Sequence, residues 1–138
     1  MTIARIFVPR DAGALALGAD EVERAIIAAE RRRGIEVDIV RTGSRGLYWL
    51  ELMIEVTTAQ GRIAYGPVSA RDVEELFAAG FLDGGPHPLR LGRPEELPFL
   101  KRQRRFTCAC SATAPLAWQA SARHSFRMWR PAGAWRKS

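Results

Sequence analysis

Residues 42–56, which read TGSRGLYWLELMIEV, decide the fold and the chemistry expected of this chain. The first half is a loop punctuated by Gly43 and Gly46, and the second half is an apolar run that predicts a strand over residues 49–57. Binding and catalytic residues often lie on a loop of this kind. No side chain here is an obvious catalyst, so the residue types at Ser44 and Tyr48 carry the argument.

Length and composition indicate one folded domain. The chain has 138 residues, of which 47% are hydrophobic, and this content is typical of a globular protein. No apolar run approaches the roughly 20 residues that a membrane span needs. The N-terminus lacks the charged, apolar and small-residue pattern of a secretory signal, so we expect a cytoplasmic protein.

Charge divides the chain into two unequal parts. The net charge is +6, but residues 1–96 hold 12 Arg and 15 acidic residues, whereas residues 97–138 hold nine Lys or Arg and no acid. Both cysteines, Cys108 and Cys110, lie in this basic end. A single Cys-x-Cys pair lacks the second ligand pair of a zinc or iron–sulfur site, so we expect two incidental thiols.

Strands and helices alternate before the loop. Residues 3–8 predict a first strand buried on both faces, and residues 9–18 predict a long loop. Residues 19–33 predict a helix, because acids crowd its first turn, arginines crowd its last turn and Gly34 follows. Residues 35–40 alternate in polarity and predict a second strand.

A hairpin and a second helix are expected after the loop. The strand over residues 49–57 and a strand over residues 62–65 are joined by a short glycine-bearing turn, which predicts an antiparallel hairpin. Ser69 is a suitable N-cap for a helix that ends at Gly80, and residues 81–82 are expected to pack back onto the sheet.

The chain changes character after residue 83. A cluster of Gly and Pro predicts a boundary there, so we expect a domain over residues 1–83 and an irregular arm or linker over residues 84–105. Residues 106–138 show no helical or strand period and contain three of the four tryptophans. We expect that tail to be disordered or to be translated from a wrong reading frame.

The order of elements is that of a thioredoxin-like α/β fold, a small mixed sheet with flanking helices. Four stretches resemble the N-terminal thioredoxin-like domain of the flavoprotein (beta) subunit of NAD-dependent formate dehydrogenase, which is related to the flavoprotein subunit of NADH-quinone oxidoreductase. They are residues 5–11 (RIFVPRD), 42–51 (TGSRGLYWLE), 61–68 (GRIAYGPV) and 97–103 (LPFLKRQ). The resemblance covers about residues 3–105 and implies an electron-transfer enzyme that, when intact, holds FMN, NAD and iron–sulfur clusters.

The resemblance also implies where a two-iron cluster would be held. Thioredoxin-like ferredoxins of this group use a Cys-x4-Cys pair after the first strand and a Cys-x3-Cys pair in a Thr-Gly-Cys-x-Gly-x-Cys loop. The corresponding positions here are Pro9, Ala14, Ser44 and Tyr48. The spacings are kept but all four thiolates are missing, and iron–sulfur clusters need thiolates. The resemblance therefore implies a degenerate ferredoxin domain with no metal, cofactor or catalytic residue in this chain.

Two further departures from the family affect the expectations. Leu52 stands where thioredoxin-like folds often carry a cis-proline, and because a cis peptide before a non-proline residue is costly, we expect a trans peptide there. The glycine-rich flavin-binding segment that follows the arm in the family is not recognisable after Arg105. We therefore expect a truncated or frameshifted copy.

These features favour a non-catalytic, cluster-free docking domain whose partners are the other subunits of a formate dehydrogenase or NADH dehydrogenase complex. Arg10, Arg41, Arg45 and Trp49 form the candidate interface, because Arg and aromatic residues anchor many interfaces. Solvated loop arginines and a core position for Trp49 are the alternatives. A thiol or cluster redox protein is excluded over residues 1–107, which contain no cysteine. Nucleic-acid binding by the basic, aromatic tail is the less favoured alternative function.

Overall fold

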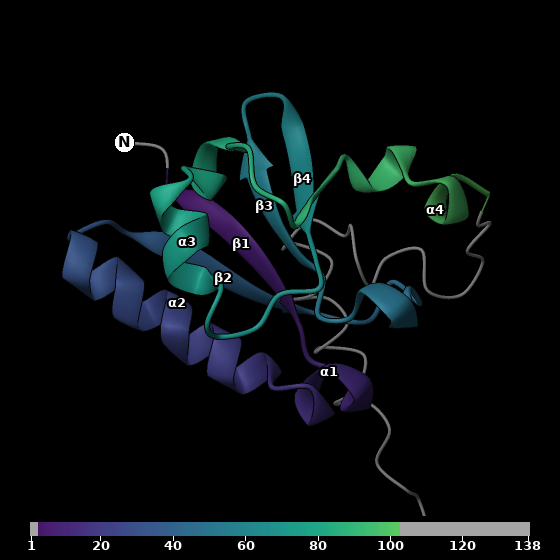
Figure 1. The fold of residues 1–138 in the computed structure, drawn as a ribbon, viewed down its shortest axis with the longest axis horizontal. Helices are drawn as coiled ribbons and strands as arrows, with labels where there is room; N and C mark the ends of the chain where they lie inside the picture. The colour runs from purple at the N-terminus through teal and green to yellow at the C-terminus, as the bar shows by residue number, and fades with distance from the viewer. Residues whose placement is uncertain (1–2, 103–138) are drawn as a thin grey trace, which may run out of the picture. The chain divides into compact units, whose positions relative to one another are not determined.

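The computed structural model describes residues 3–102. These residues form a five-stranded mixed sheet in the order β2-β1-β3-β4-β5 (Figure 1). The strands are β1 (Ala4–Pro9), β2 (Val37–Thr42), β3 (Ile54–Thr58), β4 (Gly61–Tyr65) and β5 (Arg90–Gly92). β1 and β2 are parallel, whereas β1–β3, β3–β4 and β4–β5 are antiparallel. The expected thioredoxin-like mixed sheet is present.

Residues 3–102 also contain four helices and three 3-10 turns, which lie between the strands or follow β5. The helices are α1 (Ala12–Ala16), α2 (Ala19–Arg33), α3 (Val73–Ala78) and α4 (Pro98–Arg102). The 3-10 turns are η1 (Tyr48–Leu50), η2 (Phe81–Asp83) and η3 (Pro94–Glu96). The predicted bounds of α2 are confirmed at both ends. At the C-terminal end, Gly34 adopts a left-handed φ of 62°, which ends the helix. Among residues 3–102 no helix is long and apolar enough to cross a bilayer.

The main core lies between one face of the sheet and helices α2 and α3 (Figure 1). Every second side chain of the strands and one apolar face of each helix point into this layer, because strands repeat every 2 residues and helices about every 3.6. The fully buried members from both sides include Ile6, Val8, Ile54, Val56, Tyr65, Val22, Ile26 and Leu76. Phe81 packs edge-on against Tyr65 and Phe77, with ring centroids 5.8 and 4.9 Å apart, which confirms that η2 returns to the sheet.

A smaller cluster lies on the other face of the hairpin. Leu47, Met53 and Ala64 are buried there, and partly buried leucines pack against them, namely Leu50, Leu91, Leu97 and Leu100. Leu97 and Leu100 belong to the segment of η3 and α4, and Figure 1 shows α4 on the side of β3 and β4 opposite to α3. The C-terminal part of residues 84–102 therefore folds onto the sheet.

The expectation of an irregular arm after residue 83 is wrong, because the segment contains β5, η3 and α4 and packs on the sheet. Pairing with β4 makes residues 90–92 a strand, although the flanking prolines and Gly92 predict none. The interpretation of residues 84–105 as a linker to a further domain stays a prediction. The tail over residues 106–138, with both cysteines and the proposed nucleic-acid contacts, lies outside the described residues.

Three local expectations are also wrong. The loop over residues 9–18 contains α1, because the Asp11 side chain accepts hydrogen bonds from the backbone of Gly13 and Ala14 and caps a short helix. Residues 48–50 form η1, so the third strand begins only at Ile54. The peptide bond between Glu51 and Leu52 is cis. Beside it, the Leu52 carbonyl accepts a hydrogen bond from the Val68 N–H at 2.9 Å.

Candidate functional site

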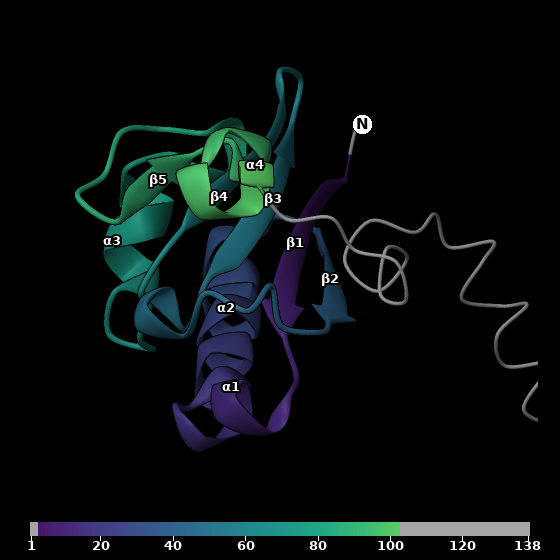
Figure 2. The same cartoon turned by 90° about the vertical axis from the view of Figure 1, so that its right-hand side faces the viewer.

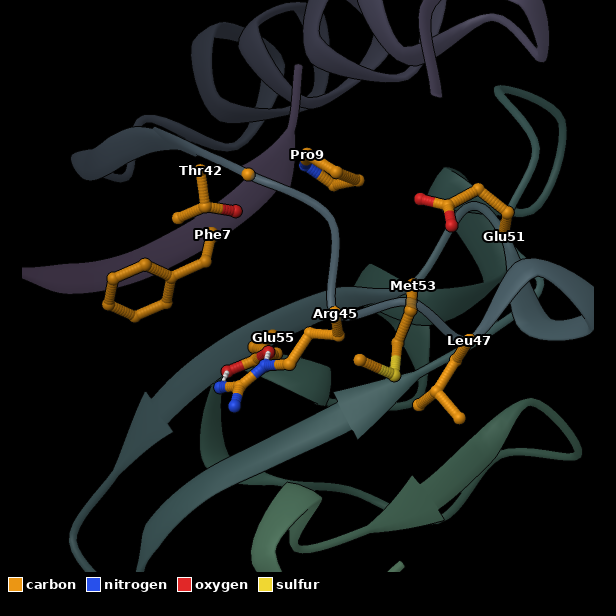
Figure 3. A pocket seen from close by; sticks show the side chains of 9 residues that line it. Phe7, Pro9, Thr42, Arg45, Leu47, Glu51, Met53 and Glu55 are labelled. Atoms are coloured by element: carbon orange, nitrogen blue, oxygen red, sulfur yellow. Dashed lines mark hydrogen bonds and ion pairs between the residues drawn. The ribbon is translucent and has the colours of Figure 1, made fainter. Parts of the chain in front are cut away.

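The expected site lies where the parallel strands β1 and β2 end side by side. Pro9 and Thr42 are register partners at these ends, and the Arg10 N–H donates to the Thr42 carbonyl at 2.8 Å. The loop after Thr42 then crosses toward β3 and leaves a small pocket beneath it (Figure 3). The pocket is lined by Phe7, Pro9, Thr42, Gly43, Arg45, Leu47, Glu51, Met53 and Glu55.

The loop is built from a hydroxyl turn and a glycine. Ser44 Oγ accepts a hydrogen bond from the Gly46 N–H at 2.9 Å, and Gly46 has a φ of 78°, which favours glycine. This turn places Leu47 in the smaller core. The η1 turn that follows directs Tyr48 and Trp49 outward, where they are 75% and 62% exposed.

A buried ion pair occupies the floor of the pocket. Arg45 donates to both oxygens of Glu55, from Nε at 2.5 Å and from Nη2 at 2.7 Å (Figure 3). Arg62 donates a third hydrogen bond at 3.3 Å, and its guanidinium carbon lies 3.8 Å from the centre of the Phe7 ring. Glu55 is only 4% exposed, and the hydrogen bonds from these two guanidinium groups satisfy its buried carboxylate oxygens. The pair fixes the loop to strand β3.

Arg41, at the end of β2, also links separate elements through its guanidinium group. Its guanidinium contacts Asp20 at 2.8 Å and also Glu23, both in the first half of α2, and donates to the Pro9 carbonyl at 3.3 Å. The Arg41 side chain is 16% exposed. Its Nε atom is buried without a hydrogen-bond partner among the described residues. Arg41 therefore ties β2 to α2 and β1.

The four positions expected to correspond to cluster ligands carry no ligand set of the required chemistry. Pro9 lines the pocket, Ala14 is fully buried in α1, Ser44 lies in the loop and Tyr48 points to solvent. Proline and alanine side chains carry no donor atom, the Ser44 hydroxyl accepts from the backbone, and residues 3–102 contain no cysteine. These residues do not fit an iron–sulfur cluster. Within residues 3–102 no group of three or more His, Cys, Asp or Glu is placed to hold a metal.

Two carboxylates near the pocket were missed from sequence. Asp11 uses Oδ1 to cap α1, and its Oδ2 is buried with no hydrogen-bond partner in the described part. Burial, and then the charge of Asp11, raise the pKa of Glu51, while a hydrogen bond with Ser44 acts in the opposite direction. The position of Asp11 just before the sequence AGALA was the available signal, since Asp is a preferred N-cap.

The four candidate interface residues separate into two kinds. Arg41 and Arg45 point inward and are paired, whereas Arg10 and Trp49 are exposed. The core position considered for Trp49 is therefore not found. Trp49 meets Phe99 of α4 edge-on, with ring centroids 5.1 Å apart. Sequence reasoning missed Phe99, because it lies in the segment expected to be irregular. An interface role for all four residues stays a prediction.

Comparison with solved structures agrees with the fold. The neighbours are thioredoxin-like [2Fe-2S] ferredoxins, so the chain has the thioredoxin-like ferredoxin fold that the sequence predicts. The wild-type protein from Aquifex aeolicus matches with a TM-score of 0.54 and 21% identity over 67% of this chain and 100% of that chain. A cysteine-to-serine variant of the same ferredoxin matches with a TM-score of 0.52 and 22% identity over 66% of this chain and 100% of that chain. No family model and no curated protein matches.

Proposed function

We propose that this chain is a cluster-free, non-catalytic docking domain of the flavoprotein subunit of an NAD-linked formate dehydrogenase or a related NADH dehydrogenase. The observation that carries the proposal is the buried Arg45–Glu55 pair at the floor of the loop pocket. In a ferredoxin of this fold the loop would bring thiolates to a cluster. Here a salt bridge crosslinks the loop to the sheet, so the loop keeps a fixed shape without a metal.

The side chains around the loop are better suited to contact with another protein than to catalysis or electron transfer. Tyr48 and Trp49 are held outward on the η1 turn, and Arg10 is exposed immediately after β1. Aromatic and Arg side chains give large contact areas and many donors, which is why they are enriched in interfaces. The intact enzyme would move electrons between NADH, FMN and iron–sulfur centres in its other domains, and this domain would hold a neighbouring subunit in place.

Absorbance and iron content test the cluster-free part of the proposal. The purified chain is expected to be colourless, to bind no iron after anaerobic reconstitution with ferrous iron and sulfide, and to oxidise no NADH. Replacing Cys108 and Cys110 by serine in every sample removes the thiols of the tail as a source of iron binding. Iron–sulfur absorbance from that cysteine-free protein would contradict the proposal.

Restoring the ligands tests the correspondence of positions. Pro9→Cys, Ala14→Cys, Ser44→Cys and Tyr48→Cys together are expected to allow iron and sulfide to bind, because the two spacings are kept. The matched control places the fourth cysteine at Leu47 instead of position 48. Equal iron binding by both variants would refute the assigned register.

Co-purification tests the docking part. When the chain is co-expressed with the subunits of an NAD-linked formate dehydrogenase, it is expected to be retained by them. Trp49→Ser should weaken this retention at least tenfold, which corresponds to an interface anchor of more than about 1.4 kcal/mol. Arg71→Ser, an exposed change beside α3, is the control. Retention that is insensitive to Trp49→Ser would contradict the docking face.

A further inference from the structure

The loop that leads into β5 is held by a buried histidine. Residues 84–89 connect η2 to β5 at the edge of the sheet (Figure 2). Within this loop the His87 side chain is only 9% exposed. Its Nδ1 atom accepts a hydrogen bond from the Leu89 N–H at 3.1 Å. A ring nitrogen that accepts a hydrogen bond carries no proton, so His87 is neutral in this arrangement and has its proton on Nε2.

The hydrogen bond to His87 fixes the start of β5. The Leu89 carbonyl accepts from the Gly66 N–H at 2.9 Å, and the next residue, Arg90, pairs with Tyr65 of β4. The peptide groups on the two sides of Leu89 are therefore both tied, one to the His87 ring and the other to the end of β4. Prolines precede and follow His87 and fix the backbone φ at both places, so the loop has little freedom to form a different hydrogen bond.

Negative charges lie on the other side of the His87 ring. Its Nε2 atom is 3.9 Å from Glu75 Oε2 of α3, and the Glu75 side chain is 79% exposed. Asp72, just before α3, is a second carboxylate that interacts with the ring. Hydrogen bonds from Ser69 hold the pKa of Asp72 below its usual value, and positive charge on His87 and on Arg71 acts in the same direction. Both carboxylates therefore favour a protonated His87.

The other titratable groups around the loop are bound to backbone carbonyls. The Arg90 guanidinium donates to the Gly84 carbonyl at 3.1 Å, and the Tyr65 hydroxyl donates to the Gly85 carbonyl at 2.8 Å. These two contacts hold the loop without involving the imidazole. The change of charge on His87 is therefore opposed chiefly by its own hydrogen bond with Leu89.

Protonation of His87 sets its two contacts against each other. An imidazolium carries a proton on each nitrogen, so Nδ1 would present a donor to the Leu89 N–H, while Glu75 and Asp72 attract the positive ring. We propose that His87 is a pH-sensitive switch: the neutral ring holds the start of β5, and the protonated ring turns from Leu89 toward the two carboxylates and releases it. Histidine ordinarily changes its charge between about pH 5 and 8, so mild acidification opens the switch. The released segment leads directly to Leu91, which packs on the smaller core.

Amide hydrogen exchange of the full chain, followed by NMR and corrected for the intrinsic rate, tests this switch. From about pH 8 to about pH 5.5, the amides of Leu89 and Gly66 are expected to lose protection at least about tenfold. The Val22 amide, which donates to the Gly18 carbonyl at 3.0 Å in α2, is the internal control and should keep its protection. The ring signals of His87 should shift over the same pH range. His124 is the other histidine of the chain, so a His87→Asn variant identifies the signals that belong to His87.

Two variants separate the switch from a general effect of acid. His87→Asn keeps an acceptor oxygen close to the position of Nδ1 and does not titrate, so Leu89 should stay protected at both pH values. Glu75→Gln leaves the ring in place and removes the nearer negative charge, so opening should move to lower pH. Glu36→Gln, an exposed change before β2, is the matched control and should leave the opening pH unchanged.

Equal protection of Leu89 at both pH values in the wild-type chain would overturn the proposal. A pH-dependent loss that persists in His87→Asn, or an opening pH that Glu75→Gln does not move, would also overturn it. If His87→Asn does not fold, the wild-type chain and Glu75→Gln still decide the question. These measurements need neither iron nor a partner subunit, so their outcome is independent of the proposed function.

Discussion

Removing Arg45 should destabilise the fold far more than removing an exposed arginine of similar geometry. Arg45→Met deletes the two hydrogen bonds of 2.5 and 2.7 Å to Glu55 and leaves this 4% exposed carboxylate with the longer bond from Arg62. Loss of one partner from a buried pair costs about 3–5 kcal/mol. Because Arg62 remains, we expect a loss of about 2–3 kcal/mol, or a melting temperature lower by roughly 10–20 °C.

The double variant distinguishes a pair interaction from general loop damage. Replacing both partners, as R45M/E55L, removes both members of the closest ion pair and leaves Arg62, whose side chain is 21% exposed; we expect this variant to lie within about 1 kcal/mol of wild type. The Arg5–Asp38 pair is the matched control, since it also has a 2.7 Å contact but its side chains are 41% and 42% exposed. Arg5→Met should cost about 0.2–1 kcal/mol.

Urea denaturation of the full chain, followed by far-UV circular dichroism, gives these free energies of unfolding. The reasoning fails if Arg45→Met costs no more than Arg5→Met. It also fails if the effects of Arg45→Met and Glu55→Leu add in the double variant, because independent contributions would mean that the two side chains do not form a coupled buried pair.

Three other changes test separate parts of the site. Burial and the Asp11 charge raise the pKa of Glu51 above 4.5, so the ionised form costs stability once the pH rises above that value. Glu51→Gln should therefore raise the urea midpoint at about pH 7 and leave it unchanged at about pH 3, and an equal gain at both would contradict this sign. Asp11→Ala should lower the free energy of unfolding by about 1 kcal/mol through loss of the α1 cap, whereas Asp11→Ser should keep most of the stability. Circular dichroism melts compare the two variants, and equal losses would exclude capping. Gly85→Ala should prevent folding, because its Cβ would overlap the Ala79 carbonyl oxygen, and a soluble protein with unchanged spectra would refute that packing.

Elements that carry their own boundary signals could be predicted from the sequence. Helix α2 has acids at its start, arginines at its end and Gly34 beyond, and its predicted bounds are those observed. The hairpin of β3 and β4 followed from two short strand-like runs joined by a short glycine-bearing turn. These elements depend on neighbours within a few residues, so a single sequence contains most of the information.

Elements that depend on distant partners could not be predicted. β5 has three residues, and its strand conformation comes from pairing Arg90 and Gly92 with β4 rather than from its own propensity. The Arg45–Glu55 contact joins a loop to a strand, and its formation depends on the left-handed turn at Gly46. The location of the pocket followed from the loop pattern, but its inward arginines did not, because the same residue types also suit a solvated surface.

The position of β5 at the edge of the sheet sets where the polypeptide can be cut. Cleavage or a stop codon after residue 83 would expose the hydrogen-bonding groups of β4 and remove the leucines that cover Met53 and Ala64. A shortened product of that kind would offer an unpaired strand edge to other chains and would be a substrate for proteases. A fragment that ends after residue 102 keeps both β5 and the leucines that cover the smaller core. Gene fusions to this domain are therefore best joined beyond α4.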